Sequence, residues 1–108
     1  MAAEESFKLG TPDRDVRPQI EAVKSYFSTE GFSEVTDPAH VQDPFSGRHI
    51  VWMSFAGERR IARLSYAWLA DHPSDAANWL DGKQVGPQLK DAEEVIISDS
   101  GLINYKGI

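Results

Sequence analysis

The stretch of sequence that decides the fold is residues 50–64, IVWMSFAGERRIARL. Its first half, Ile50 to Phe55, is rich in the β-branched and aromatic residues that favour strands. Ala56-Gly57-Glu58 then supplies a turn, because a glycine between two apolar runs is typical of a hairpin. The sequence therefore predicts two antiparallel strands joined near Gly57.

The return half of this hairpin has two interpretations. The apolar spacing from Ile61 to Leu69 matches a helical stripe, whereas a strand would run from Arg59 to Leu64. Ser65 is a competent helix N-cap, which indicates that a helix begins after it rather than before it. We therefore favour a strand to Leu64, followed by a short helical turn that ends at Ala70.

A longer helix is expected before the hairpin. Thr11-Pro12-Asp13 has the features of a helix start: a capping hydroxyl, a proline that needs no donor and an acid at the positive end of the helix dipole. Gly31 is placed to end this helix in a left-handed conformation. Residues 1–10 lack periodicity, so we expect a flexible arm followed by a single domain over residues 11–108. The apolar stripe of the predicted helix consists of Val16, Ile20, Val23 and Phe27.

The connecting segments carry weaker signals. Residues 32–36 form a short strand candidate. Two Asp-Pro steps indicate a loop over residues 37–47, because proline lacks an N–H group and restricts the residue before it. Ser74-Asp75 precedes a second short helix over residues 76–81, and Gly82 is expected to close it.

The C-terminal part is expected to form another hairpin. Residues 83–90, which include Gly86-Pro87, are interpreted as a connector. Two apolar runs, residues 95–98 and 102–105, then flank Gly101, which occupies the turn position that needs a positive φ. The predicted order is α-β-β-β-α-β-β. This order indicates an α+β fold, with an antiparallel sheet of about five strands, an N-terminal amphipathic helix and a short second helical pair.

Charge is distributed unevenly along the chain. The 108 residues include 11 basic and 17 acidic side chains, for a formal net charge of −6. Residues 44–69 nevertheless contain four arginines and no lysine against one glutamate, so this window carries +3 and the rest of the chain −9. The acidic balance disfavours non-specific attraction to DNA and to anionic membranes. The arginine fork, by contrast, suits the recognition of carboxylates or phosphates.

Catalytic and metal-binding motifs are absent from the sequence. The chain has no cysteine, which excludes a thiol nucleophile and a cysteine-based zinc site. His40 with Asp37 and Asp43 could approach a cation, but nothing in the spacing forces them together. A hydrolase or isomerase that uses His72 or His49 is the weakest hypothesis, so we expect no enzyme, no metal and no cofactor. Without an apolar run of about 20 residues or a signal-peptide pattern, we expect a cytoplasmic protein with no membrane partner.

The central hairpin is the best candidate for a contact surface. Trp52 alternates with apolar neighbours, so the strand face away from the helix carries large apolar side chains, either outward or against a second layer. We interpret the chain as a non-catalytic protein-binding module of the inhibitor, immunity or adaptor type, whose partner is another protein or a second copy in a homodimer. The alternative is a nucleic-acid-binding accessory protein, whose arginines contact phosphates while an aromatic ring stacks on bases. The candidate contact residues are Arg48, Trp52, Arg59, Arg60, Arg63 and Tyr66.

Overall fold

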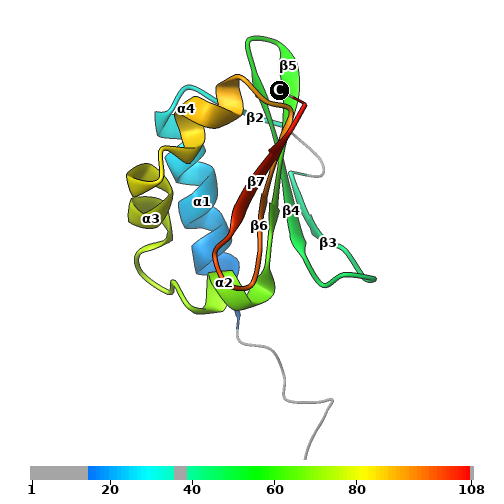
Figure 1. Cartoon of the computed structure of the whole chain (residues 1–108), viewed down its shortest axis with the longest axis vertical. Coiled ribbons are helices and arrows are strands. Elements are labelled where there is room, and N and C mark those ends of the chain that lie inside the picture. Colours follow the sequence, from blue (N-terminus) through cyan, green and yellow to red (C-terminus); the bar gives the residue numbers. More distant parts are fainter. Residues whose placement is uncertain (1–14, 36–38, 108) are drawn as a thin grey trace, which may run out of the picture.

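The computed structural model describes residues 15–35 and 39–107, which form an α+β fold with helices on one face of a six-stranded sheet (Figure 1). This confirms the predicted class, with its N-terminal helix and mostly antiparallel sheet. The helices are α1 (Arg17–Thr29), α2 (Tyr66–Ala70), α3 (Ala76–Gly82) and α4 (Val85–Lys90). The strands are β2 (Ser33–Glu34), β3 (His40–Gln42), β4 (His49–Phe55), β5 (Glu58–Leu64), β6 (Glu94–Ile97) and β7 (Ile103–Lys106).

The strands follow the order β2-β4-β5-β6-β7, and β3 also pairs with β4. β2 and β3 occupy successive parts of the same edge of β4, since Ser33 lies opposite Ser54 and His40 lies opposite Val51. Every pair is antiparallel except β5 with β6. The chain between these two strands passes through α2, α3 and α4, and a helical crossover of this kind returns the chain parallel to the strand it left. This parallel pair differs from the antiparallel sheet that the sequence predicts.

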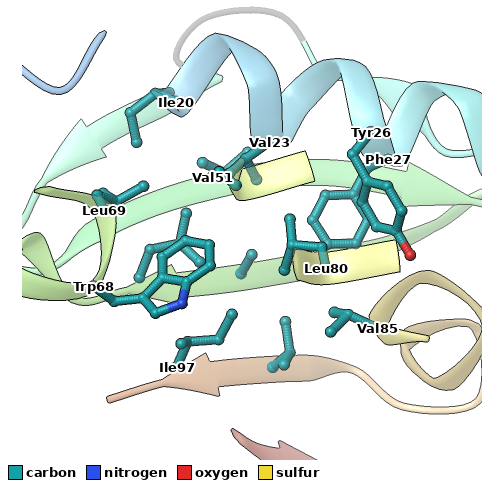
Figure 2. Packing of buried hydrophobic residues seen from close by; sticks show 14 of the residues in the cluster. Ile20, Val23, Tyr26, Phe27, Val51, Trp68, Leu69, Leu80, Val85 and Ile97 are labelled. Atoms are coloured by element: carbon teal, nitrogen blue, oxygen red, sulfur yellow. The ribbon is translucent and has the colours of Figure 1, made fainter. Parts of the chain in front are cut away.

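The hydrophobic core lies between the helices and the inner face of the sheet (Figure 2). Side chains from α1, from the sheet and from each short helix meet there, so the short helices are held by burial rather than by their own length. The four members of the predicted apolar stripe are buried, each at most 5% exposed; Ile20, Val23 and Phe27 lie in α1, and Val16 caps it. The largest fully buried side chains are Trp68, Phe27, Leu64, Leu69, Leu80, Leu89, Ile97, Val23, Val51, Val85 and Val95.

The start of α1 differs from the prediction, whereas its end agrees with it. Asp15 and Val16 are not helical, so the helix begins at Arg17 rather than near residue 12. The Asp15 carboxylate accepts a hydrogen bond from the Arg17 amide at 2.9 Å, which satisfies a donor that the helix itself leaves free. At the other end Gly31 has a φ of +97°, as predicted for the closing residue. The proposed start at residues 11–13 and the arm over residues 1–10 lie outside the described residues.

Both predicted hairpins are confirmed. Ala56 and Gly57 have φ angles of +54° and +80°, the left-handed pair that a two-residue hairpin turn requires. β5 continues to Leu64, which rules out a helix over this half of the hairpin, and Ser65 caps α2 by accepting a hydrogen bond from the Trp68 amide at 3.3 Å. In the C-terminal hairpin Gly101 takes a φ of +84° between β6 and β7.

The segment predicted as a loop over residues 37–47 contains a strand, so this prediction is partly wrong. His40–Gln42 forms β3, while Asp37-Pro38 lies outside the described residues. Asp43-Pro44 follows β3 and starts the turn toward β4, in which the Asp43 amide donates to the Arg48 carbonyl at 2.8 Å. Proline at a strand end removes no donor from the ladder, so the Asp-Pro step shortens β3 without preventing it.

The prediction of a connector over residues 83–90 is also partly wrong, because residues 85–90 form the helix α4. Gly82 is the last residue of α3, and the left-handed residue is Gln84, with a φ of +56°. Pro87 is the third residue of α4, where a helix leaves backbone N–H groups without an internal acceptor. A proline there costs no helical hydrogen bond, so Gly86-Pro87 begins a helix instead of breaking one.

Candidate protein-binding surface

The strand register divides the sheet into two faces. Residues directly opposite each other on neighbouring strands point to the same side, and successive residues alternate between sides. Val51, Ala62 and Val95 form one such row on the inner face, and all are at most 1% exposed. Their chain neighbours therefore point to the opposite side, which we call the open face. In Figure 1 α1, α3 and α4 lie on the inner side of the sheet, and α2 lies at the end of the strands.

The open face has an apolar centre. Trp52 and Ile61 are a direct cross-strand pair between β4 and β5. These apolar side chains do not belong to the core cluster, nor to the partly buried side chains packed against it. Both side chains are half-buried. The apolar residues of the open face are Ile50, which is 9% exposed, and the half-buried Val41, Trp52, Ile61 and Ile96.

The same face carries a positive charge excess. Arg59 lies opposite Ser54 at one end of the hairpin, and Lys106 lies on the edge strand β7. Arg63 sits between Ile50 and Ile96 in the register, and its guanidinium is paired with the Glu94 carboxylate. The described residues give neither Arg59 nor Lys106 an ion pair. With three cations against one carboxylate, the described part of the open face has a net charge of +2.

Arg60, one of the predicted contact residues, points the other way. Its side chain lies on the inner face and the residue is 7% exposed. Its Nε donates to the Leu89 carbonyl at 3.1 Å and its Nη2 to the Lys90 carbonyl at 3.0 Å. The guanidinium thus satisfies carbonyls at the C-terminal end of α4, where a cation is also favoured by the helix dipole. Arg60 therefore does not contribute to the open face.

Arg48 and Tyr66, also predicted as contact residues, lie together at one end of the sheet. They line a shallow pocket of about 420 Å³ between the β3–β4 turn and the start of α2. The Tyr66 ring, on one wall of this pocket, lies 6.4 Å from the ring of His49. The six predicted residues therefore occupy three places: Trp52, Arg59 and Arg63 on the open face, Arg48 and Tyr66 at this pocket, and Arg60 under α4.

Phe45 is an exposed residue that the sequence reasoning missed. It is 97% exposed at the tip of the β3–β4 turn. Asp43 holds the turn, since its Oδ1 accepts a hydrogen bond from the Phe45 amide at 3.0 Å and its Oδ2 accepts one from the Ser46 hydroxyl at 2.7 Å. These hydrogen bonds lower the pKa of the Asp43 carboxyl. The Asp-Pro step before Phe45 is the signal that could have indicated this turn.

The two histidines considered as catalytic candidates, His72 and His49, each contact another side chain of the fold. His72 contacts the carboxylate of Asp75 at 3.0 Å on the exposed rim of α3. His49 is 7% exposed and its Nδ1 lies 2.9 Å from Nε2 of His40. Among the described residues no three His, Cys, Asp or Glu side chains are grouped so that they could hold a metal ion. Asp37, one member of the triplet considered from sequence, lies outside the described residues.

Comparison with protein-family models, with curated proteins and with solved structures found no match for this chain. Within residues 15–35 and 39–107, the helices are all too short or too polar to span a bilayer.

Proposed function

We propose that this chain is a small, non-catalytic module that binds another protein through the open face of its sheet. The observation that supports this most directly is the set of apolar side chains around Trp52 and Ile61, which lies outside the core and on the side away from the helices. Contiguous apolar patches on small proteins commonly mark interaction sites. Tryptophan and arginine, both present here, are the residues most often found at interface hot spots.

The energetics favour such a surface. Removing apolar surface from water stabilises a complex by about 25 cal/mol per Å². Burial of the apolar part of the open face would therefore offset part of the translational and rotational entropy that is lost on association. The strands that carry the patch are fixed by the core beneath them, since Val51 and Ala62 alternate with Trp52 and Ile61. A rigid surface loses little conformational entropy on binding. Inhibitors, immunity-type proteins and adaptors all work through surfaces of this kind.

Nucleic-acid binding is the second candidate, and it has less support. Two of the four arginines in the central window are used within the chain: Arg60 by carbonyl groups and Arg63 by Glu94. The centre of the open face is aliphatic except for Trp52, whereas single-stranded nucleic acids bind to several stacked rings and a cationic groove. The net charge of −6 adds a general repulsion from phosphates.

The proposal is tested by affinity capture with matched variants. Ile61→Thr removes an apolar contact from the open face while it keeps a β-branched side chain suited to a strand. Asn78→Thr is the control, because Asn78 is exposed on α3, in the helical layer on the other side of the sheet. A genuine partner is captured by the wild type and by Asn78→Thr and is depleted with Ile61→Thr. The purified partner should then lose about tenfold in affinity for Ile61→Thr, or roughly 1.4 kcal/mol.

Equal capture and equal affinity for the two variants would contradict the proposal. Thermal unfolding of each variant shows whether it is folded before binding is measured. If Ile61→Thr is poorly folded, Trp52→Thr provides a second change on the same face, since Trp52 is outside the core cluster as well.

A further inference from the structure

We infer that the segment recognised by the open face is acidic: a polypeptide with an apolar stripe bordered by carboxylates. This inference rests on the proposed function and specifies the chemistry of the partner. The observation behind it is that two cations of the open face, Arg59 and Lys106, have no ion pair among the described residues. Carboxylates of a partner would complement their charge.

These two cations lie at the margin of the apolar residues of the open face. In the register Arg59 lies opposite Ser54, two residues beyond the Trp52–Ile61 pair along both strands. Lys106 lies on the same face at the edge strand β7, opposite Glu94, whose carboxylate is paired with Arg63. A partner that covers the centre therefore reaches both cations at its margins. Carboxylates there would form charge-assisted hydrogen bonds, and with Arg59 the contact can be bidentate.

The ion pair near the centre of the open face, Arg63 with Glu94, does not compete for the carboxylates of a partner. Arg63 and Glu94 neutralise each other near the centre, so this pair can be covered without leaving a single uncompensated charge. Several carboxylates belong to the short helices or their ends: Asp81 lies in α3, and Asp71 and Asp91 follow the last residues of α2 and α4. The chain thus presents its positive face in one direction, and the electrostatic field steers an acidic partner toward it.

A second copy of this chain fits the face less well. Two open faces brought together would place four uncompensated cations in one interface, and like charges in an interface oppose association. Packing the open face of one copy against the acidic helices of the next is a heterologous contact, which does not close into a dimer. The charge pattern therefore favours a different, acidic protein over self-association.

The inference is tested with a display library of random peptides about 16 residues long, selected on the immobilised full chain. We expect the enriched peptides to combine aliphatic or aromatic residues with Asp and Glu. Synthesised peptides should lose about tenfold in affinity for the Arg59→Glu/Lys106→Glu variant. The control variant, Arg17→Glu/Lys83→Glu, changes the net charge equally on the helical layer and should bind as the wild type does.

The outcomes separate the two proposals. If the enriched peptides are basic or uncharged and still lose binding to Ile61→Thr, the inferred acidity of the partner is wrong while the proposed function stands. If binding of every enriched peptide is unaffected by Ile61→Thr and by Trp52→Thr, the proposed function fails too. Binding of a single-stranded oligothymidylate that is stronger than binding of the acidic peptides would overturn the inference in favour of nucleic acid. A dimer in sedimentation that Ile61→Thr dissociates would overturn it in favour of self-association.

Discussion

His40 Nε2 and His49 Nδ1 lie 2.9 Å apart, and their nearly parallel rings join the edge strand β3 to β4. A hydrogen bond between two imidazoles needs one N–H donor and one unprotonated acceptor, so at least one ring of the pair is neutral. Burial lowers the pKa of His40 and the nearby Lys24 ammonium lowers it further, while the Glu21 carboxylate raises it. The fold therefore favours the neutral form of His40.

Acidification should destabilise the chain through this pair. Because the pKa of His40 in the folded chain lies below its ordinary value of 6.5, the unfolded chain binds more protons at mildly acidic pH. The stabilisation is complete above pH 6.5 and is lost as the pH falls through the folded-state pKa. We expect the free energy of unfolding in urea to be lower at pH 5.5 than at pH 7.5.

The histidine variants provide the control for this pH dependence. His40→Gln keeps a polar side chain but does not titrate, so its unfolding free energy should vary less with pH than that of the wild type. His72→Gln removes the exposed contact with Asp75 and should leave the dependence on His40 in place. Identical pH profiles for the wild type and His40→Gln would show that the pair does not act in this way.

Arg59 and Arg60 are adjacent in sequence, but the same substitution should destabilise the fold at Arg60 far more than at Arg59. Arg60→Ala removes the side-chain donors of the Leu89 and Lys90 carbonyls, of which Leu89 keeps the Ala92 amide as a donor, and opens a space under α4. This predicts a loss of about 1–3 kcal/mol in unfolding free energy. Arg59→Ala removes an exposed side chain without an ion pair and should change stability by less than about 0.5 kcal/mol. Equal losses in chemical denaturation would mean that the alternation along β5 is wrongly assigned.

Gly82 and Gly86 provide a second matched pair, both within helices. A Cβ at Gly86 would lie 2.6 Å from Glu30 Cγ and 2.9 Å from the Tyr26 hydroxyl, which also accepts a hydrogen bond from the Gly86 amide. Gly86→Ala should therefore cost about 1–3 kcal/mol as α4 is pushed from α1. Gly82 has open space and a helical backbone, so Gly82→Ala should stabilise the chain by about 0.5–1 kcal/mol. Melting temperatures that shift in the same direction for both variants would contradict this packing of α4.

The elements that could be predicted from sequence are those whose signal is local. The stripe of α1 repeats at helical spacing, and the Ala56-Gly57 turn lies between two apolar runs. The parallel pairing of β5 with β6 could not be predicted, because it follows from how the three short helices pack together. α4 was missed since Gly86-Pro87 has the composition of a turn, and only the contact of Gly86 with Tyr26 shows why glycine is needed there.

The positions of the candidate contact residues in the fold could be predicted only in part. Strand alternation places Trp52 and Arg63 on one face, and the register bears this out. The same alternation separates Arg59 from Arg60, but grouping the arginines by their distance along the chain concealed it. Whether the outer face of a sheet is covered depends on how segments distant in sequence pack against it. The alternation of residues within one strand does not indicate this.

The most direct test of the open face as a contact surface is the methyl NMR spectrum of the chain labelled at isoleucine δ1. Ile50, Ile61 and Ile96 lie on the open face, whereas Ile20 and Ile97 lie in the core and are at most 2% exposed. On titration with a purified partner or an enriched peptide, we expect the first three resonances to shift and the two core resonances to stay in place. Saturable binding that leaves all three open-face methyls unshifted would contradict the proposed surface.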